Sequence, residues 1–214
     1  MKKYSNFIIL IIFTLGTQAF MYYSIKNVVS DYHIINSMVE VPLIKEFVYF
    51  YDIWYPFIIL NAFLIFKNNT KAFYFLIATM LLTAFLAQVT FIVFPSMIIR
   101  PDIEVNSITS YLLDLTYKSD TPAVNCLPSM HCIYCFIVSY YLLVHTKINN
   151  KYKILLTAIS FLIVLSTVFI KQHIIEDVLL SITYTTISTI IVYFSEEVIV
   201  KLLNKLKRYQ TQKA

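Results

Sequence analysis

The chain has 214 residues, of which 59% are hydrophobic and 14% are charged, whereas a soluble domain is about half apolar and a quarter charged. Because the apolar residues come in long runs, this composition argues against a soluble domain and predicts a multi-pass membrane protein. A single glycine argues against glycine-rich phosphate loops and nucleotide-binding folds. The net charge of +5 does not indicate a nucleic-acid partner, because the basic residues fall in particular loops.

Six apolar segments are each long enough to cross a bilayer, which takes about 20 residues. In chain order they cover residues 7–25, 47–66, 72–94, 129–146, 153–171 and 175–198. The first also resembles a signal peptide, because Lys2 and Lys3 precede it, but it is long and has no small-x-small cleavage pattern at its end. We therefore expect an all-α fold, a bundle of six transmembrane helices that forms one domain over residues 1–214.

The distribution of lysine and arginine among the loops predicts the orientation of this bundle. With six spans, 12 of the 17 basic residues fall on one side of the membrane and the other five fall on the opposite side. Since basic loops stay in the cytoplasm, both termini are expected there, and the loops 26–46, 95–128 and 171–175 are expected to face outward from the cell membrane. The basic tail after residue 200 fits an anchor close to anionic lipid.

The longest loop, residues 95–128, is expected to carry a short interfacial helix over 108–118. Aromatic residues also gather near the outward end of the second span, where anchoring at the membrane interface explains them without a ligand. These residues are Tyr49, Tyr51, Trp54 and Tyr55. The three cysteines are more typical of small buried apolar side chains than of a zinc site, because no second cysteine pair accompanies them. They are Cys126, Cys132 and Cys135.

A polar segment, Pro128-Ser129-Met130-His131, stands at the start of the fourth span. Proline is favoured at the first position of a helix, so this span is expected to begin at Pro128, with Asn125 or Cys126 near the cap. A helix N-terminus and the Ser129 hydroxyl both suit a phosphate, and His131 could give a proton to a leaving oxygen. The alternative is that Ser129 only caps the helix and that His131 is an interfacial histidine.

A second polar segment lies between the fifth and sixth spans and contains His173 and Asp177. Residues four apart share one face of a helix, so the Asp177 carboxylate could accept a hydrogen bond from one imidazole nitrogen and leave the other free to attack phosphorus. The alternative is a purely structural His–Asp hydrogen bond. Lys171 could add positive charge to a bound phosphate, or it could be a lysine that reaches toward the membrane interface.

Arg100 follows the third span, and its planar guanidinium suits a phosphate. The alternative is an ion pair within the loop, with Asp102 or Glu104. With six spans, Arg100, His131 and His173 all fall at the outward ends of helices. Topology therefore brings them to one layer of the membrane.

Taken together, these segments resemble the type 2 phosphatidic acid phosphatase superfamily, the membrane relatives of vanadium haloperoxidases. That family carries Lys-x6-Arg-Pro, Pro-Ser-Gly-His and Ser-Arg-x5-His-x3-Asp in this order. The corresponding segments here run from Val93 to Arg100-Pro101, from Pro128 to His131, and from Ser166-Thr167 through His173 to Asp177. The chain departs from the pattern at Val93, Met130 and Thr167, so two of the family's phosphate-binding cations are missing.

The resemblance implies a two-step displacement at a His-His-Asp centre. In it, His173 is the nucleophile, Asp177 orients His173, and His131 protonates the leaving lipid oxygen. The phosphoryl oxygens would be held by Arg100, Lys171, Ser129 and Ser166. No metal or other cofactor is implied.

The expected function is therefore hydrolysis of a lipid phosphate or pyrophosphate ester at the outer face of the plasma membrane, with the lipid tail remaining in the bilayer. The first alternative is transfer of a phosphorylated headgroup between lipids. It is suggested because Pro-Ser-Met-His with Lys-Gln-His-x3-Asp looks closer to the inositolphosphotransferase and sphingolipid-synthase-like branch. A third possibility, from another class, is a transporter or lipid-binding membrane protein without catalytic activity. The sequence leaves the oligomeric state open.

Overall fold

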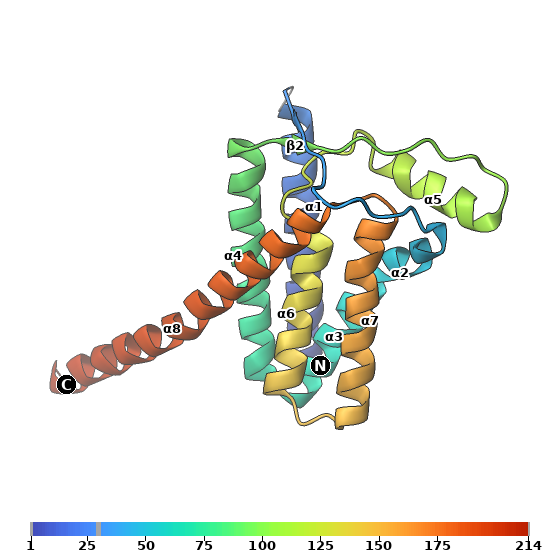
Figure 1. Cartoon of the computed structure of the whole chain (residues 1–214). Helices are drawn as coiled ribbons and strands as arrows, with labels where there is room; N and C mark the ends of the chain where they lie inside the picture. Colours follow the sequence, from blue (N-terminus) through green and yellow to red (C-terminus); the bar gives the residue numbers. More distant parts are fainter. Residues whose placement is uncertain (1, 29–30, 214) are drawn as a thin grey trace.

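The computed structural model describes the backbone of residues 2–28 and 31–213 and the side chains of residues 4–25 and 31–195 (Figure 1). Its backbone is built mainly of helices. In chain order these are α1 (Lys2–Val28), the 3₁₀ turn η1 (Lys45–Phe47), α2 (Val48–Asp52), α3 (Trp54–Asn68), α4 (Thr70–Val93), α5 (Ile108–Ser119), α6 (Met130–His145), α7 (Asn150–Phe169) and α8 (Ile175–Lys213). Two short strands, β1 (His33–Ile34) and β2 (Ser96–Met97), add a parallel pair that the all-helical prediction did not include.

Five helical segments of the described chain are long and apolar enough to cross a membrane. They are Tyr4–Ile25, Lys45–Asn68, Thr70–Val93, Asn150–Phe169 and Ile175–Ser195. Five of the six predicted spans are therefore confirmed as helical segments of this kind. The predicted fourth span is also a helix, α6, but with 16 residues it is only about 24 Å long, shorter than a hydrocarbon core of about 30 Å.

The second of these segments is interrupted near its start. α2 ends at Asp52, Ile53 has φ −79° and ψ 0°, and α3 then begins at Trp54. Pro56 accounts for the interruption, because proline has no N–H to donate to the carbonyl of residue 52 and its ring collides with that carbonyl. The bend places the aromatic residues of α2 and early α3 beside the N-terminus of α6.

α6 lies in the middle of the bundle and contacts α3, α4, α7 and α8 (Figure 1). About one full turn near its start is completely buried, at Cys132, Ile133, Tyr134 and Cys135. Large apolar side chains remain exposed on the surrounding helices, among them Ile12 and Phe13 on α1 and Phe161 on α7. An exposed apolar surface of this extent fits a lipid environment. The cysteines are buried as predicted.

Two loops cover one end of the bundle, and we call this end the loop end. They are residues 31–44 and 94–129, joined by the β1–β2 pair, in which His33 is in register with Ser96. The second loop carries α5, which confirms the short helix predicted over 108–118. Ser107 caps α5, since its hydroxyl accepts a hydrogen bond from the Ser110 N–H.

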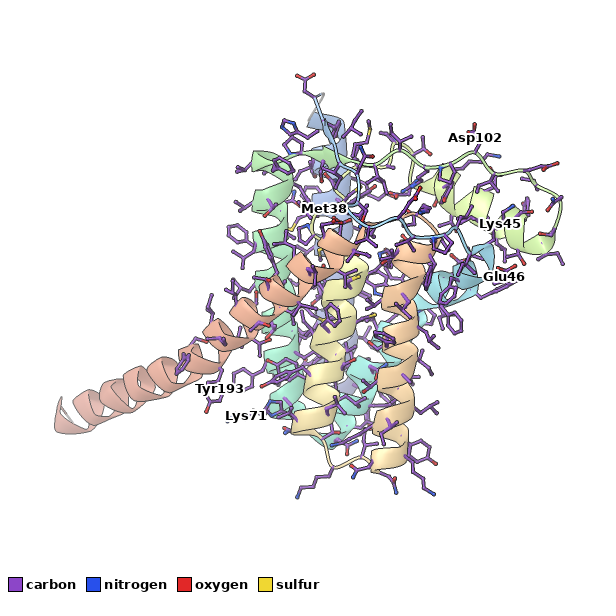
Figure 2. The ribbon with its side chains drawn as sticks, in the orientation of Figure 1. Met38, Lys45, Glu46, Lys71, Asp102 and Tyr193 are labelled. Atoms are coloured by element: carbon purple, nitrogen blue, oxygen red, sulfur yellow. The ribbon has the colours of Figure 1, made fainter. Side chains whose placement is uncertain are left out.

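Charged side chains mark both ends of the bundle. Figure 2 shows Lys45, Glu46 and Asp102 near the loop end, whereas Lys71 lies toward the opposite end. The first loop is tied to α8, because the Glu176 carboxylate accepts hydrogen bonds from the Ser37 hydroxyl at 3.0 Å and the Met38 N–H at 2.9 Å.

α8 is longer than the predicted sixth span, which ended at residue 198. It continues as one helix to Lys213 and leans away from the other helices toward its C-terminal end (Figure 1). The side chains from residue 196 onward, like those of Lys2, Lys3 and Lys26, lie outside the described residues. The basic anchor predicted after residue 200 falls in this part of the chain.

Candidate active site

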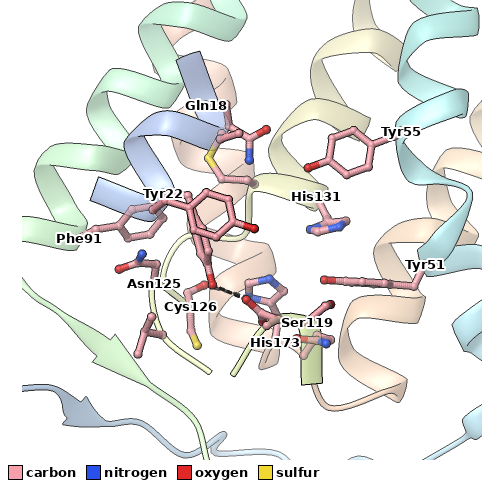
Figure 3. Close-up of a pocket in the computed structure, with 16 residues that line it drawn as sticks. Gln18, Tyr22, Tyr51, Tyr55, Phe91, Ser119, Asn125, Cys126, His131 and His173 are labelled. Atoms are coloured by element: carbon pink, nitrogen blue, oxygen red, sulfur yellow. Dashed lines mark hydrogen bonds between the residues drawn. The ribbon is translucent and has the colours of Figure 1, made fainter. Parts of the chain in front are cut away.

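A cavity of about 300 Å³ opens at the loop end of the bundle, and both predicted catalytic histidines line it (Figure 3). The ring centroids of His131 and His173 are 6.4 Å apart, with an angle of 54° between the ring planes. The two histidines, which were predicted to lie in one layer of the membrane, are thus close to each other at the same end of the bundle. The other lining residues are Gln18, Ala19, Tyr22, Tyr23, Tyr51, Tyr55, Phe91, Ser119, Asp120, Val124, Asn125, Cys126, Met130 and Gln172.

His173 lies in the turn between α7 and α8, held by a hydrogen bond from its backbone N–H to the Thr167 carbonyl at 2.9 Å. Its Nδ1 lies 2.9 Å from Oδ2 of Asp177 and 2.9 Å from the carbonyl oxygen of Cys126. Both partners accept, so the hydrogen-bond network assigns the ring proton to Nδ1. This tautomer leaves the lone pair on Nε2.

Asp177 is fully buried in the first turn of α8. The contact expected from the four-residue spacing is present, although His173 itself precedes the helix, which begins at Ile175. The Oδ2 atom also accepts a hydrogen bond from the Ile174 N–H at 3.1 Å, as the side chain of the third helical residue does in a capping box. Asp177 thereby fixes both the start of α8 and the plane of the His173 ring.

His131 is held between two aromatic rings in the first turn of α6. Its ring centroid is 4.3 Å from that of Tyr51 and 4.2 Å from that of Trp54, whose indole N–H donates to the His131 carbonyl at 3.2 Å. The prediction that this aromatic cluster anchors the membrane interface is wrong for Trp54, which is only 1% exposed. The bend before α3 turns this side chain into the core, where it supports His131.

Ser129 caps α6, and the predicted helix start at Pro128 is wrong. The helix begins at Met130, and the Ser129 hydroxyl accepts a hydrogen bond from the Cys132 N–H at 3.4 Å. Serine is among the most favourable N-cap residues, and this preference outweighs that of proline for the first helical position. The backbone N–H and carbonyl of Ser129 are both bonded to the Ser181 hydroxyl at 3.1 Å, which joins α6 to α8. Ser129 is fully buried and does not line the cavity.

Arg100 lies behind the cavity wall, with its side chain only 7% exposed. Its guanidinium donates to the Asp120 carboxylate, to the Gln172 side-chain oxygen and, at 3.1 Å, to the Asp120 carbonyl. The loop ion pair considered from the sequence therefore exists, but its acid is Asp120, while Asp102 and Glu104 are exposed. Asp120 and Gln172 themselves line the cavity.

The Arg100 guanidinium also lies over the ring of Tyr117, at 5.0 Å from its centroid. Burial raises the pKa of Tyr117 to about 12, an effect that the positive charge of Arg100 only partly offsets. The phenol therefore stays neutral, and its hydroxyl donates to the Ile170 carbonyl at 2.6 Å. This bond fixes α5 against the turn that carries His173.

Lys171 and Ser166 do not reach the cavity. The Lys171 ammonium donates to the Val41 carbonyl, and the Ser166 hydroxyl donates to the Ile163 carbonyl at 2.6 Å within α7. Val93, which stands where the family has lysine, is 77% exposed on the surface of the bundle. In the described part of the chain, the cavity lining contains neither lysine nor arginine.

Several polar residues of the cavity wall were not predicted as site residues from the sequence, among them Tyr22, Asp120, Asn125 and Gln172. The Tyr22 hydroxyl, from α1, donates to the Asp120 carboxylate (Figure 3). One signal was available for this helix, since Gln18 and Tyr22 are polar groups four residues apart in an apolar run. Asn125 adopts a left-handed backbone conformation with φ 58°, which asparagine tolerates better than most residues.

The chemistry available at this site is that of two imidazoles facing one cavity, one of them backed by a buried carboxylate. Burial, with the nearby Asp177 and Asp120 carboxylates, raises the pKa of the Cys126 thiol well above its usual range, so Cys126 contributes its carbonyl rather than a thiolate. Among the described residues, no group of three or more His, Cys, Asp or Glu is placed to hold a metal ion. Comparisons with family models, curated proteins and solved structures find no match to this chain.

Proposed function

We propose that the protein is a lipid phosphatase of the plasma membrane, which hydrolyses a lipid phosphate or pyrophosphate ester through a phosphohistidine intermediate. The observation that carries this proposal is the pairing of His131 and His173 across one cavity, with Asp177 behind His173. A nucleophile, its orienting carboxylate and a facing acid–base group are the parts that such a displacement needs.

The proposed topology has six spans, with α6 as the fourth, both termini in the cytoplasm and the loop end outside the cell. It is supported by the helices that are long and apolar enough to cross a membrane and by the excess of basic residues in the loops assigned to the inside. In this arrangement the cavity opens at the outer face, where the headgroup of a lipid lies, and the lipid tail stays between the apolar helices.

In the first step, Nε2 of His173 attacks the phosphorus atom, and the bond between phosphorus and the lipid oxygen breaks. His131, protonated at the start of the step, gives its proton to that oxygen, so the lipid alcohol leaves neutral. In the second step, His131 takes a proton from water as the water oxygen attacks phosphorus, and the phosphorus–nitrogen bond breaks. Inorganic phosphate leaves, and both histidines return to their initial states.

Asp177 stabilises the positive charge that His173 acquires in the first step, since its carboxylate lies 2.9 Å from Nδ1. Tyr51 and Trp54 fix the plane of His131 from both faces. Arg100 neutralises the Asp120 carboxylate at the cavity wall and holds the Gln172 side chain in place. In this proposal no phosphate oxygen is bound directly by Lys171, Ser129 or Ser166. Their side chains bond to the backbone around the site instead.

The test is release of inorganic phosphate by the purified protein in detergent, over phosphatidic acid, phosphatidylglycerol phosphate and an isoprenyl pyrophosphate. We expect the wild type to release phosphate from at least one of them and His173→Ala and His131→Ala to lose several orders of magnitude in rate. His145→Ala is the matched control, because His145 lies at the other end of α6, where its ring packs against Tyr141. Release that survives His173→Ala would contradict the proposal.

Transfer of a phosphorylated headgroup to another lipid is a second candidate, favoured by the side-chain amides that line the cavity, which suit a hydroxyl group. Incubating the same substrates with added lipid donors and alcohol acceptors distinguishes transfer from hydrolysis. Transfer without phosphate release would replace the hydrolase, and neither reaction by a folded protein would favour a non-catalytic transport or lipid-binding role.

A further inference from the structure

Three side-chain amides line the cavity beside the histidines, on Gln18, Asn125 and Gln172. Asn125 is 5% exposed and Gln172 is 2% exposed. Four buried amide atoms have no hydrogen-bond partner among the described residues. They are the oxygen and the nitrogen of Asn125, the nitrogen of Gln172 and the oxygen of Gln18. Figure 3 shows Gln18 and Asn125 on different sides of the cavity.

Such groups are rare in a folded protein, because a buried polar atom without a hydrogen bond costs about 1–3 kcal/mol. Several of them on the wall of one cavity indicate that the cavity holds something that bonds to them. They also lie close to the reacting centre along the chain, because Gln172 precedes His173 and Asn125 precedes Cys126, whose carbonyl contacts Nδ1 of His173.

The chemistry of the lining selects the kind of group. The Asn125 amide has an oxygen that accepts a hydrogen bond and a nitrogen that donates one, and both are present whichever way the two atoms are assigned. An unprotonated phosphate oxygen only accepts and cannot bond to an amide oxygen, whereas a hydroxyl both donates and accepts. The Asp120 carboxylate on the same wall is paired with Arg100, and the described cavity lining contains no lysine or arginine that could attract a second anion.

We infer that Asn125, Gln172 and Gln18 form a subsite for a hydroxyl-bearing, uncharged part of the substrate next to the phosphorus atom, as in a glycerol or other polyol phosphate. This inference rests on the proposed function and narrows it, because it disfavours an isoprenyl pyrophosphate, whose second phosphate would face this wall.

Binding of two small phosphates tests the inference without catalysis. Glycerol 3-phosphate and n-propyl phosphate have the same carbon chain and the same phosphate, and differ by two hydroxyl groups. We expect the full-length protein in detergent to bind glycerol 3-phosphate about tenfold more tightly, as measured by ligand-dependent thermal stabilisation, since each neutral hydrogen bond is worth about a two- to tenfold change in affinity.

Two variants each remove one amide, the first with the backbone conformation kept and the second with the side-chain length kept. Asn125→Gly keeps the left-handed backbone conformation at φ 58° and the backbone N–H bond to the Ser96 carbonyl. Gln18→Met keeps the length of the side chain. Each variant is expected to weaken the binding of glycerol 3-phosphate about two- to tenfold and to leave the binding of propyl phosphate unchanged. Gln88→Met is the control, because Gln88 bonds to the Met21 carbonyl on α1 and does not line the cavity.

The outcomes separate this inference from the proposed function. Equal binding of the two phosphates, or a preference that both variants retain, overturns the subsite while histidine-dependent phosphate release stands. Binding of neither phosphate by a protein that shows such release also overturns the subsite. The subsite stands if Asn125→Gly loses the preference for the hydroxyl-bearing phosphate. If the His173→Ala variant of the same protein still turns over lipid, the phosphohistidine mechanism is overturned.

Discussion

Replacing Asp177 by asparagine removes the negative charge behind His173 and keeps the size of the side chain. In the structure the Asp177 carboxylate accepts from Nδ1 of His173 at 2.9 Å, so the change converts a charge-assisted hydrogen bond into a neutral contact. A hydrogen bond to a charged group is worth about 1.5–3 kcal/mol, which corresponds to about a 10- to 150-fold loss of rate.

The structure also argues that the loss stays within this range. In the serine-protease triad, asparagine at the corresponding position imposes the wrong histidine tautomer and costs about 10⁴-fold. Here the Cys126 carbonyl lies 2.9 Å from the same Nδ1 atom and remains an acceptor in the variant. The proton therefore stays on Nδ1, and Nε2 keeps its lone pair.

The assay is the initial rate of phosphate release from the best lipid substrate, with Asp177→Asn and His173→Ala measured side by side. Asp114→Asn is the matched control, because Asp114 pairs with Lys118, which is 72% exposed at the surface of α5. A rate for Asp177→Asn equal to that of the wild type would refute the orienting role of Asp177. A loss as large as that of His173→Ala would refute the role given to the Cys126 carbonyl.

Three further predictions concern the frame of the site. Trp54→Ala is expected to lower the free energy of unfolding by about 3–5 kcal/mol, followed by circular dichroism in denaturant, because the indole is 1% exposed and packs on His131; a change below about 1 kcal/mol would contradict this packing role. Cys126, whose raised pKa keeps the thiol protonated in neutral and mildly alkaline buffer, is expected to resist maleimide in the folded protein and to react after denaturation, as read by intact mass; rapid labelling of the native protein would show that the thiol is accessible. Asp120→Ala is expected to cost about 1.5–3 kcal/mol, measured by the same denaturation, because buried Arg100 loses its carboxylate partner; unchanged stability would show that Gln172 and the backbone carbonyls suffice.

Several elements of the fold could be predicted because their causes are local in the chain. An apolar run of about 20 residues must satisfy its backbone within itself in lipid, and five runs of this kind are indeed helices. The short helix in the second loop followed from its amphipathic pattern, and the capping pair Ser107 and Ser110 explains where it starts. The break at Ile53 was not predicted, although its cause is also local, because Pro56 has no N–H to donate to the carbonyl four positions earlier.

Other features of the fold depend on packing and were not predicted. α6 runs close to its predicted bounds, but its central place among four other helices was not predicted, because its apolar sequence looks the same as that of a lipid-facing span. Trp54 reads as an interfacial anchor from its place near a span end, yet the bend before α3 directs it inward to His131.

For the site, the sequence alone determined which polar residues come together when they are close in the chain or at the same end of the spans. The spacing of His173 and Asp177 is close enough to dictate their contact, and the span count brings His131 to the same end of the bundle. The tertiary structure alone decided that Arg100 faces Asp120 and that Asn125 and Gln172 complete the cavity wall. The physical reason is that loop conformation depends on many weak contacts between distant residues, so the partner of a loop side chain is settled by packing and not by its neighbours in sequence.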